Sequence, residues 1–174
     1  MNIYVLLKRT FDTEEKITLS NGKINEDGAE FIINPYDEYA VEEAIVVRDA
    51  QGGEVTVISV GSEEAEKQLR TALAMGADKA VLINTEEDLD ESDQYTTSKI
   101  IAEYLKDKSA DLIIAGNVAI DSGSGQVGPR VAELLNIPYI TTITKLEIDG
   151  TTATIVRDVE GDSEIIETSL PLLV

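Results

Sequence analysis

The chain has 174 residues, of which 43% are hydrophobic, and this size and composition suit one globular domain with a buried core. Cysteine and histidine are both absent, so disulfides, thiolate nucleophiles, Cys-based metal sites and Ser-His-Asp catalysis are excluded. Because 34 acidic residues outnumber 14 basic ones, the formal net charge is -20, which repels nucleic acid. We expect no nucleic-acid partner, and we assign no catalytic residue and no metal ligand.

The acidity has two explanations that the sequence leaves open, namely solubility and steering toward basic partner proteins. No apolar run approaches the roughly 20 residues needed to span a bilayer. The N-terminus also lacks the basic region and the cleavage site of a signal peptide. We therefore expect a cytoplasmic protein without an integral membrane segment.

The first predicted strand covers Ile3 to Lys8, and its apolar run is typical of a strand buried on both faces of a parallel sheet. Residues 11–33 then interrupt the alternation of strands and helices, and we expect them to form a small β-hairpin insertion, called here the hairpin excursion. Within it, residues 17–19 and 31–33 are strand-like, and Asn21-Gly22 is a strong turn signal.

The middle of the chain alternates between helical and strand-like segments. In chain order these are a helix over 37–50 that ends at Gly52-Gly53, a buried strand over 55–60, a helix from its predicted N-cap Ser62 to Gly76, and a buried strand over 79–83. The acidic residues 85–95 predict an exposed loop, with a disordered tip expected. A helix over 97–106, a strand over 111–115 and a helix from about Val127 to Leu135 follow.

Residues 139–174 change the period and become rich in Thr, Ile and Val. Four strand-like segments, 139–148, 151–158, 163–168 and 170–174, predict an antiparallel β extension. The predicted fold is therefore one α/β domain over residues 1–174. We expect a Rossmann-like parallel sheet with flanking helices and a small antiparallel β appendage.

A candidate ligand site lies where the predicted strands end, because open parallel sheets bind ligands beyond the carboxyl ends of their strands. The Gly- and Ser-rich segment 117–129 precedes a helix, so its backbone amides could hold a phosphate. It matches neither the GxGxxG fingerprint nor the P-loop pattern, so a plain loop remains equally open. Residues 34–37 have two interpretations as well, either the start of a helix or a contact with the ligand. The Lys8 side chain also has two, either contact with a phosphate or exposure to solvent at the end of a strand.

Four separated segments resemble the electron transfer flavoprotein β subunit. They are Asn34 to Ala44, Arg70 to Ala80, Ala119 to Pro129, and the stretch from Arg157 to Val174. The resemblance implies a fold shared with universal stress proteins and other adenine nucleotide α-hydrolase-like domains. It also implies a heterodimer with an α subunit that holds most of the FAD. Such a heterodimer takes electrons from acyl-CoA or other dehydrogenases and passes them to a quinone oxidoreductase or another acceptor, and the β subunit does no bond chemistry of its own.

The resemblance further implies that the β subunit binds AMP, or a second FAD in electron-bifurcating members. By position, the nucleotide contacts would be Leu6, Asn34, Pro35, Tyr36, Asp37, Val60, Ala119, Ile120, Asp121, Ser122, Gly123, Ser124, Gly125, Gln126, Val127, Gly128 and Pro129. Among these, Ser124, Gly125, Gln126 and Gly128 are the best candidates for phosphate contacts.

Two departures from the family pattern are visible. Many relatives have Asp-Gly-Asp-Thr where this chain has Asp121-Ser122-Gly123-Ser124. The loss of one acid favours anion binding, but it does not decide whether the bound nucleotide is AMP or FAD. Family members also continue past Val174, so we expect the sequence to be the N-terminal part of a longer subunit. The alternative function is a stand-alone ATP- or AMP-binding module of the universal stress type, although its phosphate-loop pattern is not found here.

Overall fold

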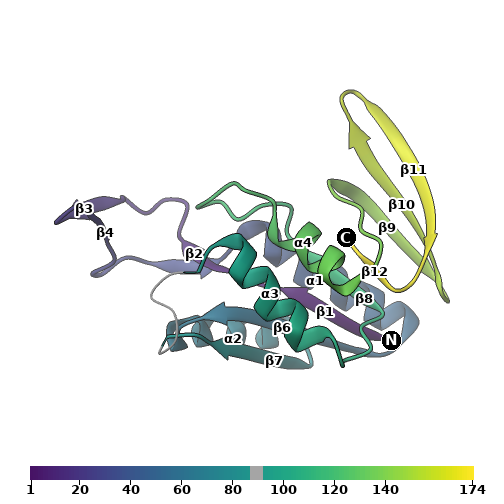
Figure 1. Cartoon of the computed structure of the whole chain (residues 1–174), viewed down its shortest axis with the longest axis horizontal. Coiled ribbons are helices and arrows are strands. Elements are labelled where there is room, and N and C mark those ends of the chain that lie inside the picture. The colour runs from purple at the N-terminus through teal and green to yellow at the C-terminus, as the bar shows by residue number, and fades with distance from the viewer. Residues whose placement is uncertain (87–91) are drawn as a thin grey trace.

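Five parallel strands form the central sheet of the computed structural model, which describes residues 1–86 and 92–174 (Figure 1). The order across the sheet is β12-β8-β1-β6-β7. In chain order the strands are β1 (Asn2–Leu6), β6 (Glu54–Gly61), β7 (Lys79–Asn84), β8 (Leu112–Ala115) and β12 (Leu172–Leu173). The predicted α/β fold with a parallel sheet is confirmed. The expected disordered tip of the acidic loop falls on 87–91, outside the described residues.

The central strand β1 is buried on both faces, as its apolar run predicts. Ile3 and Val5 belong to one hydrophobic cluster and Leu6 to the other, and these three side chains are at most 6% exposed. Because successive side chains of a strand point to opposite faces, an apolar residue is needed at almost every position. β1 pairs with β6 on one side and with β8 on the other.

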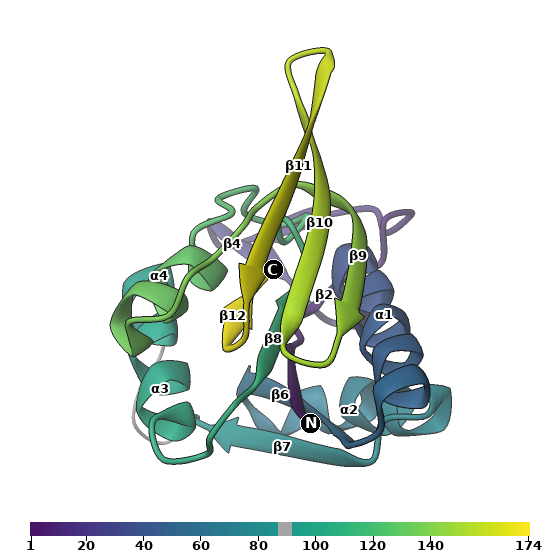
Figure 2. The ribbon, with the colours of Figure 1, turned by 90° about the vertical axis from the view of Figure 1, so that its right-hand side faces the viewer.

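Two pairs of helices cover the two faces of this sheet (Figure 2). α1 (Pro35–Gln51) and α2 (Glu66–Met75) lie on one face, and α3 (Gln94–Leu105) and α4 (Val127–Leu135) lie on the other. The chain leaves β1 toward α1 and leaves the neighbouring β8 toward α4, so the connections diverge to opposite faces. A crevice is expected at this switch point.

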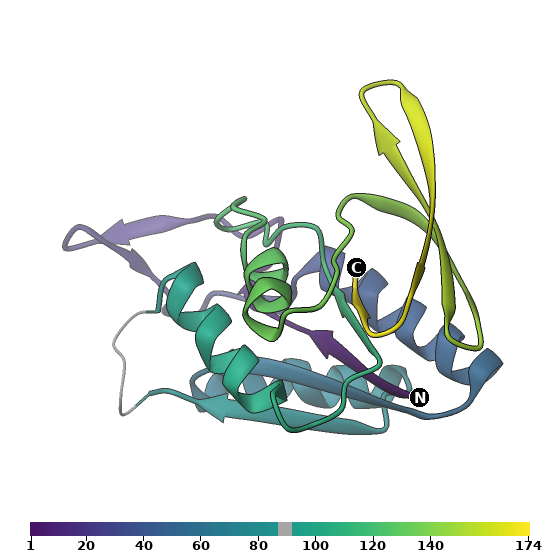
Figure 3. The ribbon, with the colours of Figure 1, turned by 45° about the vertical axis from the view of Figure 1, so that its right-hand side comes forward.

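The predicted hairpin excursion is confirmed. β2 (Arg9–Phe11) pairs antiparallel with β5 (Phe31–Ile33), and β3 (Thr18–Ser20) pairs with β4 (Lys23–Asn25). Asn21 and Gly22 join β3 to β4 with φ values of 52° and 78°, the two positive angles that a type I′ turn requires. The β3–β4 hairpin projects from the body of the protein (Figure 3).

The antiparallel extension is confirmed in part. β9 (Ile143–Asp149), β10 (Thr152–Val159) and β11 (Asp162–Ser169) form a three-stranded antiparallel sheet. The predicted last strand, 170–174, does not belong to it, because β12 instead joins the central sheet parallel to β8. Leu172 and Leu173 are 0% and 2% exposed there, on opposite faces of the central sheet in its two hydrophobic clusters.

Three smaller expectations are corrected. Ser62 makes no side-chain cap, because a 3-10 turn over Glu63–Ala65 intervenes and α2 begins only at Glu66. β7 is the edge strand of the sheet and is only partly buried, because it has a neighbour on one side. Tyr139 does not open the antiparallel sheet but forms a parallel bridge with Leu173. Across the described residues, no helix has the length and apolarity needed to cross a membrane.

Candidate functional site

A cavity of about 510 Å³ opens at the carboxyl ends of the central strands. Its volume lies within the range of small-molecule sites. The wall includes many of the residues expected to contact a nucleotide: Leu6, Tyr36, Asp37, Val60, Ala119, Ser122, Ser124, Gly125, Gln126, Val127, Gly128 and Pro129. The other members of the expected set lie off the wall: Asn34, Pro35, Ile120, Asp121 and Gly123. The switch-point location thus brings most of the predicted residues together, and their contacts with a nucleotide stay a prediction.

Asp37 joins the ends of two neighbouring strands to the first turn of α1. Its Oδ2 accepts the backbone N–H of Lys8 at 2.7 Å, and its Oδ1 accepts the backbone N–H of Gly116 at 3.2 Å. Burial of the carboxyl, which is 6% exposed, raises its pKa from 3.8 to about 7, although the two amide hydrogen bonds and the charge of Lys8 oppose that rise. Asp37 therefore lines the cavity and clamps β1 to β8 by binding the backbone amides that follow these two strands.

Gly116 must be glycine because α1 approaches β8 closely at this point. A Cβ on Gly116 would lie 2.8 Å from Cβ of Tyr36 and 2.9 Å from the backbone nitrogen of Asp37. Real Cβ atoms do not come so near to backbone atoms. The absence of a side chain lets the Asp37 carboxylate reach the Gly116 amide. The sequence pattern alone gives Gly116 no role beyond following the strand predicted over 111–115.

Asn34 positions the Gly- and Ser-rich loop. It is 1% exposed, and its Nδ2 donates to the carbonyl oxygen of Val118 at 2.9 Å. Its Oδ1 accepts the backbone N–H of Ile120 at 3.1 Å. The side chain is therefore engaged with the loop backbone, and any effect of Asn34 on a ligand acts through the loop.

Lys8 and Asp121 form a second tie to the same loop. The Nζ of Lys8 lies 2.6 Å from Oδ2 of Asp121, and both side chains are partly exposed. The sequence left phosphate contact and solvation open for Lys8; the structure shows its ammonium half exposed and paired with a carboxylate, and contact with a phosphate stays a prediction. The pairing also neutralises the remaining acid of the loop, which would otherwise oppose an anion in the cavity.

The backbone between Gly123 and α4 is shaped to present amides. Gly123 and Gly125 have φ values of 62° and 59°, which residues with a Cβ rarely adopt. The amides of Val127 and Gly128 open α4, where helical N–H groups have no partner within the helix. No acidic residue occupies that first turn, so the partial positive charge of the helix end is not offset there.

The Gln126 side chain is held by its own helix. Its Oε1 accepts Nε of Arg130 at 3.1 Å and Nη2 at 2.8 Å. Consequently a ligand at this site would meet the backbone of Gln126 rather than its carboxamide oxygen. The arrangement can bind an anion through backbone amides.

The sequence did not identify the part of the wall that β9 contributes. Residues 141–146 line the cavity, together with Tyr39 and Glu43 of α1 and Gln94 and Thr97 of α3. The only local signal was the Thr-rich start of this segment, in which Thr142 adopts a positive φ of 55°. The position of this segment in the cavity wall depends on how the antiparallel sheet packs against α1, and no short sequence pattern predicts that packing.

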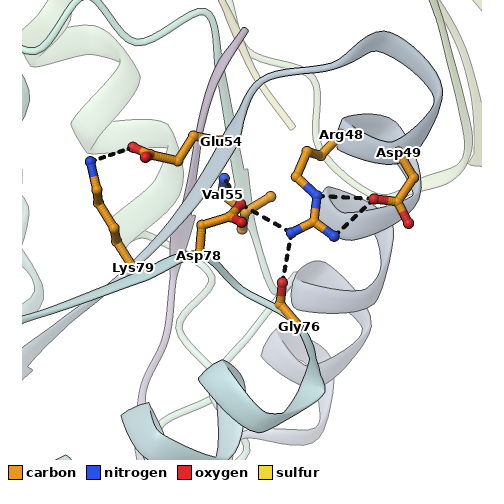
Figure 4. A network of polar contacts seen from close by, with 7 residues as sticks. All are labelled: Arg48, Asp49, Glu54, Val55, Gly76, Asp78 and Lys79. Atoms are coloured by element: carbon orange, nitrogen blue, oxygen red, sulfur yellow. Dashed lines mark hydrogen bonds and ion pairs between the residues drawn. The ribbon is translucent and has the colours of Figure 1, made fainter.

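The segment from Arg70 to Ala80 has a structural role far from the cavity. Oδ2 of Asp78 accepts the backbone N–H of Val55 at 2.8 Å and lies 3.0 Å from Nη1 of Arg48 (Figure 4). The same Nη1 donates to the carbonyl oxygen of Gly76 at 2.6 Å. This network fastens the ends of α1 and α2 to the amino end of β6, opposite the site.

The parallel sheet, its switch point and the cavity there define a Rossmann-like α/β protein. A family model described as the electron transfer flavoprotein domain matches residues 21–174. The chain is 68% identical over 174 residues to the electron transfer flavoprotein subunit beta of Bacillus subtilis, covering 100% of this chain and 68% of that relative. It is 43% identical to the subunit of the same name in Syntrophomonas wolfei, with the same coverage. It is 38% identical to the caffeyl-CoA reductase-Etf complex subunit CarD of Acetobacterium woodii, covering 99% of this chain and 67% of CarD. This chain belongs to the electron transfer flavoprotein family, as a β subunit.

Proposed function

We propose that this β subunit binds AMP in the switch-point cavity and works with a flavin-carrying α subunit as an electron carrier. The heterodimer would take electrons from acyl-CoA or other dehydrogenases and deliver them to a quinone oxidoreductase or another acceptor in the cytoplasm. The FAD held with the α subunit supplies the redox chemistry. This chain supplies one nucleotide-binding domain over residues 1–174 and no bond chemistry of its own.

One observation carries the nucleotide proposal. The loop ahead of α4 turns through two glycines with positive φ, and the first-turn amides of α4 carry no acid beside them. Backbone amides in this arrangement favour a phosphate. Leu6, Ile58 and Val60 line the same cavity and provide an apolar wall suited to a purine.

AMP is the first choice over a second FAD. The relative at 68% identity is an electron transfer flavoprotein subunit, whereas the relatives named as parts of CoA reductase systems are 38% and 36% identical. A second FAD is the alternative, and it would share the same phosphate position. A stand-alone ATP-binding module is tested by including ATP among the ligands.

Calorimetry of the protein with AMP, FAD and ATP tests the proposal. Gly125→Ala should weaken AMP binding about tenfold, because alanine resists a φ of 59° and its Cβ would lie 3.2 Å from the carbonyl oxygen of Asn117. Gly150→Ala is the matched control, since Gly150 has a φ of 58° with open space around it on a turn outside the cavity wall. This control should bind AMP like the wild type. If neither AMP nor FAD binds at millimolar concentration, the proposal is wrong.

A further inference from the structure

The β3–β4 hairpin has an apolar face that is exposed. Leu19 and Ile24 are directly paired across the hairpin and are 73% and 52% exposed. Ile17, which is 50% exposed, precedes Leu19 by two residues, the spacing that places both on one face of an extended segment. The other positions of the hairpin are polar: Thr18, Ser20, Lys23 and Asn25.

Such a hairpin is not expected to present three branched apolar side chains to water without a partner. Two-stranded hairpins are marginal on their own, and single exposed apolar residues are ordinary, but a cluster on a projecting element marks an interaction surface. Figures 1 and 3 show the hairpin reaching away from the central sheet and the helices. We call Ile17, Leu19 and Ile24 the hairpin face.

The β2–β5 pair, from which the hairpin extends, is anchored to the body of the protein. The guanidinium carbon of Arg9 lies 3.3 Å from the centroid of the Phe31 ring, and its Nη2 lies 2.6 Å from Oε2 of Glu64. The rings of Phe11 and Phe31 are 4.4 Å apart between centroids. Residues 12–17 and 26–30 join this anchored pair to the β3–β4 hairpin.

The charges around the hairpin face indicate the chemistry of the partner. Residues 12–30 contain six acidic residues and two lysines. In the part of the chain that the structure describes, these six carboxylates form no ion pair: Asp12, Glu14, Glu15, Glu26, Asp27 and Glu30. A second copy of this chain, with a net charge of -20, would be repelled from this rim. An apolar groove bordered by lysines and arginines would be complementary to it.

We propose that the hairpin face docks into an apolar groove with a basic rim on the flavin-carrying α subunit. This inference rests on the proposed function, because it assigns the surface that holds the heterodimer together. A permanent subunit fits better than a transient donor or acceptor, since obligate interfaces are the more hydrophobic class and keep such residues covered. Residues 12–17 and 26–30 connect the hairpin to β2 and β5, whose chain neighbours Lys8 and Asn34 contact the loop that borders the cavity.

The test measures binding of this protein to the FAD-loaded α subunit that accompanies the Bacillus subtilis relative. Leu19→Ser combined with Ile24→Ser should weaken that binding at least about 100-fold, as expected for a central apolar pair in an interface. Leu134→Ser combined with Ile165→Ser is the matched control, because it removes one Leu and one Ile that are 47% and 76% exposed on α4 and β11. The control should bind the α subunit within about threefold of the wild type.

Two further readouts separate docking from misfolding and from a failure of the proposed function. AMP binding by the hairpin variant should equal that of the wild type, and amides 17–25 of the wild type should gain hydrogen-exchange protection in the complex. Wild-type affinity in the hairpin variant, an equal loss in the control, or unchanged exchange at 17–25 would each overturn the docking proposal while leaving the heterodimer intact. A wild-type protein that binds no α subunit would instead refute the heterodimer, and the docking proposal with it.

Discussion

Replacing Asp37 by Asn should remove a pH-dependent loss of stability. The carboxyl is buried between the Lys8 and Gly116 amides, and burial raises its pKa from 3.8 to about 7. The folded protein therefore binds this proton more tightly than the unfolded chain does. Between those two pKa values the folded state carries the extra proton, so the free energy of unfolding falls as pH rises. The Asn variant, which resembles the protonated acid, should lack this component.

The magnitude follows from the difference between the two pKa values. One pKa unit corresponds to about 1.4 kcal/mol, so the carboxyl should contribute about 3 kcal/mol of pH dependence between pH 5 and pH 8. Two opposing effects determine the difference in stability between the Asn variant and the wild type. The variant avoids the pH-dependent loss, but Asn accepts only one of the two amide hydrogen bonds, which costs about 1 kcal/mol. The Asn variant should accordingly be close to or below the wild type at pH 5 and above it at pH 8.

Urea denaturation of both proteins at fixed ionic strength, from pH 5 to pH 8, measures this difference. Glu38→Gln supplies the control, because it makes the same change of charge at an exposed position one residue along α1. Its offset from the wild type should vary with pH far less than that of Asp37→Asn. A difference in the free energy of unfolding between Asp37→Asn and the wild type that stays constant with pH would refute a raised pKa for Asp37. A variant that becomes less stable relative to the wild type as pH rises would refute it too.

Three other changes probe the same end of the sheet. Gly116→Ala should lower the free energy of unfolding by about 1–3 kcal/mol in urea denaturation, because its Cβ overlaps Tyr36 and the α1 backbone. Asn34→Ala should cost about 1–3 kcal/mol, since it removes both partners of two part-buried backbone groups of the loop, and calorimetry should show weaker AMP binding as well. A double-mutant cycle of Lys8→Met and Asp121→Asn should give a coupling below about 1 kcal/mol, because both side chains are partly exposed; a larger value would show a pair shielded from water.

Local signals accounted for most of the architecture. The Asn21-Gly22 turn was predictable because a type I′ turn needs positive φ at both central residues, and this requirement acts over two residues only. The parallel sheet was predictable because a strand buried on both faces needs an unbroken apolar run, as in Ile3 to Lys8. Ser62 failed as a cap for a local reason too, since a 3-10 turn can replace the first turn of a helix without changing the sequence signal.

The candidate site was predictable in place but not in detail. The strand order of an α/β fold locates a crevice at the switch point, and the glycines ahead of α4 indicated which loop would border it. The ties that hold this loop were not predictable. Asn34 reaches Val118 across 84 residues, and Lys8 meets Asp121 from another strand end, so each pair becomes visible only when β1 and β8 are adjacent.

The sequence by itself determined the order of the elements, the hairpin turn, the amide-rich loop and the family, because each is encoded in a short pattern or in ordered motifs. The tertiary structure alone decided that β12 joins the central sheet, that β9 walls the cavity and that Asp37 clamps two strands. A strand's apolar composition states that it must be buried, but not beside which neighbour. That choice depends on which unpaired edge and which buried volume the rest of the chain leaves available.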